Sequence, residues 1–342
     1  MRARRGAHPD VKWISVAFGI ALSALCLWIA FRRVELADLM ASFRLADFRW
    51  LIVYPVFATA LNLIRSEIWR LLLRKRVSVA DAFWGYSVGF LVNNVMPLRV
   101  GEAARIGVLA RKRQLPIMEV AAAAGIERVL DMLSVVLILA IALPLTTGTL
   151  GMQHAVVVAA VLTAVVIAGI VVVVMFGESL EPFVERVLTM VAATHADAFV
   201  RRWREFHGAL GVMREPSIAI PATLGALSVW ALTVVLQWTV LRAFQPSAGL
   251  IDAALLVGVV SIASAVPAAP GAIGTYQYVA QQALTLPFPA LYTMTSALAI
   301  ALISHAASYV YSSVLGVVGL WYLGVSLASF TPGARTQPEP AP

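Results

Sequence analysis

Charged residues, cysteine and nucleotide-binding motifs are scarce in this chain, and each scarcity excludes a class of protein. Asp, Glu, Lys and Arg together make up 13% of the 342 residues, whereas a soluble domain carries roughly 25%. The single cysteine, Cys26, cannot form an intrachain disulfide. No Gly-rich nucleotide loop occurs, which argues against ATP-driven transport by this chain alone. His, Cys and carboxylates nowhere have metal-ligand spacing, so neither a metal nor another cofactor is expected.

Apolar residues dominate the composition and indicate where the chain resides. They make up 61% of the positions, and the mean hydropathy is +0.86. A membrane-spanning helix needs roughly 20 such residues. Suitable runs are Val11–Phe31, Trp50–Leu73, Val120–Leu143, Val156–Phe176, Ile218–Phe244 and a stretch within Leu291–Leu323. The sequence therefore predicts an all-α integral membrane protein with about six full spans. The net charge of +8 is then expected to mark cytoplasmic loops, not a nucleic-acid partner.

Two further apolar segments are interrupted in the same way. The first contains Pro97 and then Gly101, and the second contains Pro267, Pro270 and Gly271, so that a glycine follows a proline at a spacing of four in both. In a membrane protein, a matched pair of Pro/Gly-interrupted segments indicates the binding site of a transporter. These structural breaks also require a polar interior, because non-helical backbone at membrane depth must face protein or a water-filled cavity.

The basic residues predict how these segments are oriented. Cytoplasmic loops carry an excess of Lys and Arg, which places both termini in the cytoplasm of a multi-pass inner-membrane protein. The same rule makes 79–113 a re-entrant hairpin entered from the cytoplasm and 252–286 one entered from outside, as in an inverted repeat. Residues 178–216 are expected to form a cytoplasmic amphipathic segment. One polytopic domain, 1–330, precedes a disordered Pro-rich tail, 331–342.

The helices that restart after the breaks predict a binding site for an anion. A helix start presents unpaired N–H groups and the positive end of the macrodipole, which suits a phosphate. Arg99 would add a bidentate cation beside the first start, although it could instead pair locally with Glu102. The expected substrate-binding residues are Asn94, Arg99, Glu102, Arg105, Arg128, Tyr276 and Gln277.

Ionisable residues inside the spans form a second candidate group. A charge at mid-membrane costs at least about 2.5–3.5 kcal/mol, so it needs a partner or a function. Glu127 and Asp131 share one helical face at a spacing of four, and Arg65 or Arg99 is a natural cation between them. The pair either couples transport to protons or serves as an interhelical salt bridge, and His305 either titrates near neutral pH or packs. The expected charge network is Arg65, Glu67, Glu127, Asp131 and His305.

Four blocks together resemble a known family over roughly residues 12–323. They are Glu67-Ile68-Trp69-Arg70, Asn94-x-x-Pro97-x-Arg99-x-Gly101-Glu102-x-x-Arg105, Glu127-Arg128-Val129-x-Asp131 and Pro267-x-x-Pro270-Gly271-x-Ile273-Gly274. They resemble the lysylphosphatidylglycerol synthase transmembrane family, or flippase-like membrane proteins, of bacteria and archaea. The resemblance implies a membrane part that flips an aminoacylated lipid in two-domain members, and other lipids, including hopanoids, in stand-alone relatives.

The resemblance also has limits that shape the expected function. The soluble aminoacyl-transferase domain is not expected in this chain, so synthase activity is not carried over. Many relatives have an arginine where this chain has His305, which bears on the charge of the substrate. We expect a flippase, not an enzyme, that moves a lipid with an anionic or phosphate-bearing headgroup between leaflets.

The sequence is also compatible with two other functions. One is a membrane-embedded lipid-modifying transferase, for which the external carboxylates would be Glu35, Asp38 and Asp47, none adjacent to another. The other is an accessory subunit of a lipid biosynthesis complex, such as that of hopanoids. The expected partners are thus a membrane lipid, possible lipid-biosynthesis enzymes and a possible second copy of the chain.

Overall fold

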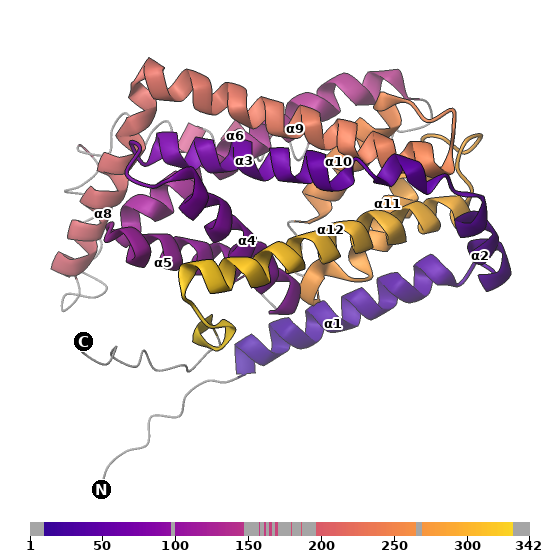
Figure 1. Cartoon of the computed structure of the whole chain (residues 1–342), viewed down its shortest axis with the longest axis horizontal. Coiled ribbons are helices and arrows are strands. Elements are labelled where there is room, and N and C mark those ends of the chain that lie inside the picture. Colours follow the sequence, from indigo (N-terminus) through magenta and orange to yellow (C-terminus); the bar gives the residue numbers. More distant parts are fainter. Residues whose placement is uncertain are drawn as a thin grey trace, which may run out of the picture.

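The computed structural model describes residues 10–96, 100–146, 196–264 and 269–330, with a few isolated positions between 147 and 195. Every regular element in this part of the chain is helical, which confirms the all-α prediction. Most helices run along the long axis of the molecule (Figure 1). They are α1 (Asp10–Phe31), α2 (Leu36–Leu45), α3 (Tyr54–Leu72), α4 (Val79–Val95), α5 (Gly101–Arg113), α6 (Ile117–Ala142), α8 (Ala196–Leu210), α9 (Pro216–Phe244), α10 (Leu250–Ala263), α11 (Thr275–Thr285) and α12 (Met294–Leu323).

Four helical stretches are long and apolar enough to cross a membrane. They are Phe48–Leu72, Ile117–Leu145, Pro216–Phe244 and Met294–Leu323. They coincide with four of the six predicted spans, and α1 covers a fifth. The sixth, Val156–Phe176, lies almost wholly outside the described residues, as do the first half of the predicted amphipathic segment and the tail at 331–342. The total of six spans therefore stays a prediction.

The first interrupted segment folds as the antiparallel helix pair α4–α5. Pro97 itself lies outside the described residues, but α4 ends at Val95 just before it, and Met96 is extended (φ −103°, ψ 142°) as a residue preceding proline must be. A Cβ on Gly101 would lie 2.0 Å from the carbonyl oxygen of Gly89, so only glycine lets α5 start this close to α4. At the far end of the pair, Arg113 Nε donates to Asp81 Oδ2 over 2.6 Å.

The second interrupted segment folds as the pair α10–α11, joined by a short 3-10 turn at Pro270–Ala272 (η6). Gly271 and Gly274 adopt φ values of +66° and +93°, which side-chain-bearing residues rarely adopt. A Cβ on Gly274 would also lie 2.1 Å from the carbonyl oxygen of Ser23 on α1. At the end of this pair away from the break, the hydroxyl of Tyr292, which precedes α12, donates to Asp252 near the start of α10 over 2.7 Å.

Helix α12 packs against both pairs. Its contacts show that the ends of the two pairs away from their breaks point toward opposite ends of the molecule. The end of α5 lies by the end of α12, where Lys112 Nζ is 6.0 Å from the ring centroid of Tyr322. The end of α11 lies by the start of α12, where Gln281 Nε2 donates to the carbonyl of Met294 over 2.9 Å. The 30 residues of α12 separate these ends by about 45 Å. An inverted repeat would give this arrangement, but the repeat itself and the depth of each pair in a membrane stay predictions.

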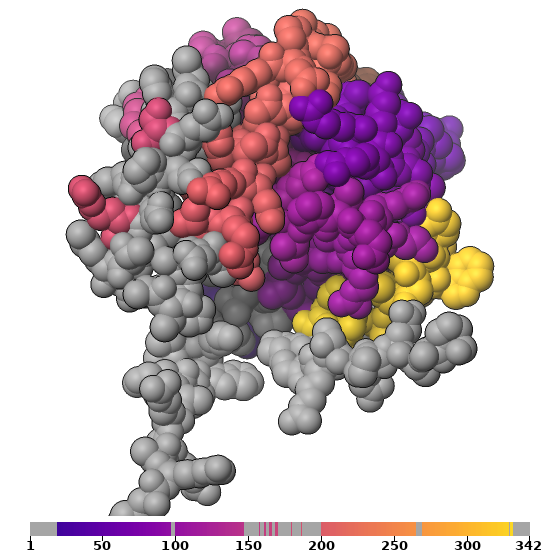
Figure 2. All heavy atoms as spheres, turned by 90° about the vertical axis from the view of Figure 1, so that its left-hand side faces the viewer, coloured from indigo at the N-terminus to yellow at the C-terminus, as the bar shows by residue number. Residues whose placement is uncertain are grey.

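The breaks of the two pairs meet beside α12. Tyr309 on α12 donates its hydroxyl to the carbonyl of Asn94 over 3.1 Å. A Cβ on Gly271 would lie 3.6 Å from the same carbonyl and 2.8 Å from the Tyr309 ring. Figure 1 shows α4 and α5 toward one end, α10 and α11 toward the other, and α12 running past both. Figure 2 shows the end of the molecule at which α5 and α8 lie.

Candidate functional site

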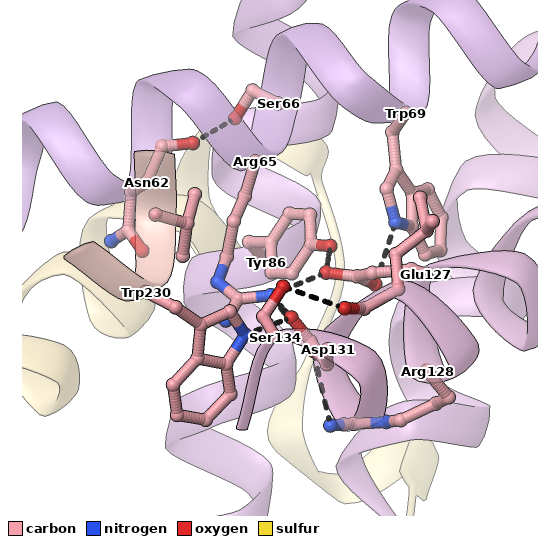
Figure 3. Close-up of polar contacts among 12 residues, drawn as sticks. Asn62, Arg65, Ser66, Trp69, Tyr86, Glu127, Arg128, Asp131, Ser134 and Trp230 are labelled. Carbon is pink, nitrogen blue, oxygen red and sulfur yellow. Dashed lines mark hydrogen bonds and ion pairs between the residues drawn. The ribbon is translucent and has the colours of Figure 1, made fainter. Parts of the chain in front are cut away.

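Four ionisable side chains from α3, α5 and α6 form a charged cluster: Arg65, Arg105, Glu127 and Asp131. Arg65 Nη1 lies 2.7 Å from Glu127 Oε1 and 3.1 Å from Asp131 Oδ2, so the guanidinium bridges both carboxylates (Figure 3). Arg105 Nη2 lies 3.0 Å from Glu127 Oε2. The spacing of Glu127 and Asp131 on one face of α6 places both within reach of the same cation.

Aromatic donors complete the carboxylate contacts of the charged cluster. Trp69 Nε1 donates to Glu127 Oε2 over 2.9 Å, and the hydroxyl of Tyr86 donates to Glu127 Oε1. Trp230 on α9 donates from Nε1 to Asp131 Oδ1 over 2.7 Å. Each carboxylate oxygen therefore has a partner, which is the condition under which buried charges are tolerated. This is the geometry of an interhelical lock, while proton coupling through the same pair stays a prediction.

Arg105 is buried in the cluster, with a relative exposure of 5%. Its guanidinium carbon lies 4.8 Å and 4.5 Å from the ring centroids of Trp69 and Tyr86, within cation–π range. Its Nε has no hydrogen-bond partner in the described part of the chain. A third guanidinium borders the cluster, because Arg128 Nη1 lies 3.7 Å from Asp131 Oδ2. Arg128 also pairs with Glu102, so three guanidinium groups face three carboxylates and the formal charges cancel.

A pocket of about 500 Å³ lies next to the cluster and shares Arg65 with it. We call it the central pocket. Asn94 at the end of α4, Ser264 after α10 and Tyr276 at the start of α11 all line it, so it lies where both helix pairs break. The rest of its polar lining comes from α3, α9, α10 and α12. Those residues are Tyr54, Asn62, Arg65, Trp230, Thr233, Gln237, Ser261, Ser304, His305, Ser308, Tyr311 and Ser312.

Neutral hydrogen bonds hold the wall formed by α11 and α12. The His305 ring stacks on Tyr276 with centroids 4.6 Å apart, and His305 Nδ1 lies 2.9 Å from Gln277 Nε2. Gln277 Oε1 accepts the N–H of Gly274 over 2.7 Å, so this side chain also caps the restarted helix. His305 thus has the contacts of a packed, hydrogen-bonded residue beside the pocket.

The structure brings some of the sequence-predicted residues together and separates others. Asn94, Tyr276, Arg65 and His305 line the central pocket. Arg105, Glu127 and Asp131 belong to the charged cluster, and Gln277 lies behind His305. Arg128 pairs with Glu102 at a partly exposed position, and Glu67 pairs with Arg70 over 2.8 Å, all four outside the described lining. Pro97, Arg99 and Pro267 lie outside the described residues, whereas Gly101, Pro270 and Gly271 stand at the breaks as expected.

Sequence reasoning missed several residues of the pocket wall. Asn62 and Gln237 are amides within apolar spans, and Trp230 is one of many aromatic residues. An amide inside a span is a usable signal, because an unsatisfied polar group is costly in lipid. A serine in a helix gives no such signal, because its hydroxyl can bond to its own backbone.

Comparison with known proteins gives the family of the chain. The family described as the lysylphosphatidylglycerol synthase TM region matches residues 16–316, and the chain belongs to it. The chain is similar to a protein named Glycosyltransferase AglD from Haloferax volcanii, at 27% identity over 369 aligned positions. That match covers 92% of this chain and 55% of the relative, so the chain spans about half the length of that protein. No solved structure matches. The family and the four apolar stretches identify a membrane protein.

Proposed function

We propose that this protein moves a lipid between the two leaflets of the membrane by holding the headgroup in the central pocket. The observation that carries the proposal is the position of the pocket. It lies where two helix pairs break, and these pairs open toward opposite ends of α12. Many secondary transporters bind their substrate between discontinuous helices at the interface of two inverted repeats.

The polar lining supports transport because it lies among long apolar helices. Hydroxyl and amide groups at this depth have no water to solvate them unless they face a cavity. The lining therefore offers a lipid headgroup a polar environment partway along the molecule. Of the arginines expected to hold an anionic headgroup, Arg105 and Arg128 are in ion pairs outside the described lining of the pocket. The anionic headgroup stays a prediction from the sequence.

The name of the glycosyltransferase relative favours a second candidate, a membrane-embedded transferase or a subunit that serves one. Such an enzyme needs a carboxylate free to act on its substrate. The described lining of the central pocket contains none. Of the carboxylates predicted to be external, Asp47 accepts two side-chain hydrogen bonds from Arg49 over 2.8 and 2.9 Å, and these bonds hold its pKa below the usual value. Both carboxylates of the charged cluster also bind neighbouring side chains and are not free to act on a substrate. These contacts favour transport over catalysis.

A reconstitution experiment tests the proposal. The purified protein is placed in liposomes that carry a lipid labelled on one acyl chain with a fluorophore, and a membrane-impermeant reductant reports how much label reaches the outer leaflet. We expect the wild type to expose label faster than empty liposomes. Thr233→Trp would fill the pocket and abolish this gain. The matched control is Ser228→Trp, on the exposed face of the same helix, which should behave as the wild type.

Two results would overturn the proposal. One is a wild-type rate equal to that of empty liposomes for every headgroup tried. The other is a folded Thr233→Trp variant that translocates lipid as fast as the wild type, because transport would then bypass the central pocket. In either case the transferase candidate would be tested next, by incubation with labelled sugar donors.

A further inference from the structure

The central pocket contains no uncompensated charge among the described residues. Arg65 is the one charged side chain in that lining, and its Nη1 contacts both Glu127 and Asp131. With Arg105 and the Arg128–Glu102 pair that borders it, the cluster balances three cations against three anions. A phosphate entering the pocket would therefore leave water without gaining a free counter-charge, which is costly in a low-dielectric site.

Three hydroxyl groups of the wall present acceptors, because their protons are already committed. Thr233 donates to the carbonyl of Val229 over 2.7 Å and Ser261 donates to that of Val257 over 2.6 Å, both within their own helices. Ser264 likewise donates to the carbonyl of Ser261 over 2.6 Å. Each oxygen retains a lone pair that can accept from a ligand.

Two of the three amides in the described lining add further acceptors. Asn94 Nδ2 donates to Ser312 and Ser313 over 2.9 and 3.0 Å, which uses both of its protons. Gln237 Nε2 donates to Ser304 over 2.9 Å. The carbonyl oxygen of each amide remains for a ligand. An acceptor-rich wall pairs with ligand groups that donate, and a fully ionised phosphate donates nothing, whereas every hydroxyl group of a sugar or polyol donates once.

Aromatic rings complete the lining and point to the same chemistry. Tyr54, Trp230, Tyr276 and Tyr311 all contribute to the pocket. The face of an aromatic ring carries negative partial charge, so it repels a phosphate and attracts the slightly positive C–H groups on the face of a sugar ring. The volume of about 500 Å³ lies within the range of roughly 300–1,000 Å³ typical of small-molecule sites.

We infer that the central pocket binds an uncharged, polyhydroxylated headgroup, as in a glycosylated lipid, and discriminates against a phosphate. This inference rests on the proposed function, since it names the substrate class of the same pocket. It departs from the anionic headgroup expected from the sequence, because that expectation came from arginines that the structure places in ion pairs or does not describe.

The test compares two labelled lipids with identical acyl chains, monoglucosyl diacylglycerol and phosphatidylglycerol, in the same reconstituted liposomes. We expect the glucosyl lipid to be translocated at least about tenfold faster, the effect of one or two unsatisfied hydrogen bonds in a desolvated site. Equal rates, or faster phosphatidylglycerol, would overturn the headgroup class and leave transport standing. If neither lipid moves, the thermal unfolding temperature of the protein in detergent is measured with each lipid to test whether the pocket binds it. Stabilisation by the glucosyl lipid alone would retain the headgroup class and reject transport, while equal stabilisation or none would reject both.

Two variants keep the inference falsifiable when one of them folds poorly. Gln237→Lys puts a cation into the pocket and should shift the ratio of the two rates toward phosphatidylglycerol by about tenfold or more. Its matched control, Gln245→Lys, lies just beyond α9, outside the described lining, and should not change the ratio. Ser261→Ala removes one acceptor with little change in volume and should slow the glucosyl lipid selectively. An unchanged ratio in folded Gln237→Lys and Ser261→Ala proteins would show that this pocket does not select the headgroup.

Discussion

The charged cluster and the central pocket share Arg65 but have opposite chemistry. In the cluster, charges are buried among aromatic rings and every carboxylate oxygen has a partner. In the pocket, the described lining apart from Arg65 is neutral and rich in hydroxyl groups, amides and tyrosines. The residues that stand out most in the sequence therefore form the scaffold, and less conspicuous ones form the surface that a ligand would contact.

The physical reason is the cost of a charge in an apolar environment. A buried ion must be neutralised nearby, so the charges of α3, α5 and α6 are used to hold these helices together. An unpaired charge in the pocket would carry a desolvation cost of its own wherever water is excluded. Hydroxyl groups bonded to their own helices avoid this penalty and still offer acceptors. Substitutions in either region test this division between scaffold and pocket.

Glu127→Ala should be the most destabilising change. It leaves Arg65 and Arg105 without their shared carboxylate, and breaking a buried pair in this way typically costs about 3–5 kcal/mol. We expect a sharp fall in the thermal unfolding temperature in detergent, or no folded protein. Glu67→Ala is the matched control, because its pair with Arg70 is partly exposed. A Glu127→Ala protein as stable as the Glu67→Ala protein would mean that the cluster is not part of the scaffold.

Gly316→Ala should destabilise the contact between α4 and α12, along which the pocket wall is built. A Cβ at this position would lie 2.3 Å from the Cβ of Leu91 and 2.7 Å from the carbonyl oxygen of Ser87. Overpacking of this kind costs about 1–3 kcal/mol. Gly107→Ala, whose new Cβ meets nothing within 4 Å, should be neutral or slightly stabilising. Equal unfolding temperatures for the two variants would contradict the close packing of α12 on α4.

Asn94→Ala should have a moderate effect on stability and a larger one on transport. The change removes the bonds to Ser312 and Ser313 that tie the end of α4 to α12. Losing such partly buried hydrogen bonds costs about 1–3 kcal/mol. Because Asn94 also lines the pocket, we expect slower translocation of the glucosyl lipid even at temperatures where the variant is fully folded. Translocation by this variant at the wild-type rate would show that Asn94, at the first break, is not part of the binding surface.

Glu102→Gln should have the smallest effect. Glu102 pairs with Arg128, and both side chains are substantially exposed, at 35% and 49%. Pairs of this kind contribute about 0–1 kcal/mol. The sequence predicts headgroup contacts at these two residues, whereas the structure places them outside the described lining of the pocket. Translocation at the wild-type rate, measured beside Asn94→Ala, would support the structure. A complete loss of translocation would instead indicate that the headgroup binds at Glu102 and Arg128, as the sequence predicts.

Much of the scaffold was predictable because its signals are local. Pro97 and Gly101 predict the end of α4 and the start of α5, since proline restricts the preceding residue and glycine permits close approach. The spacing of Glu127 and Asp131 predicts a shared face. The contact of Arg105 with Glu127 was not predictable, because Arg105 follows the break and its direction depends on how α5 packs against α6.

By itself, the sequence determined that this is an all-α membrane protein of its family, with two helix pairs broken by proline and glycine and charges that need partners. These properties follow from composition, local backbone sterics and the cost of burying charge. Only the tertiary structure decided which arginines are neutralised, that both breaks meet beside Tyr309, and that the described lining of the central pocket is neutral apart from the ion-paired Arg65. Those features depend on which faces of α3, α9 and α12 pack together. The positions of hydroxyl groups along each helix do not predict which faces of different helices meet.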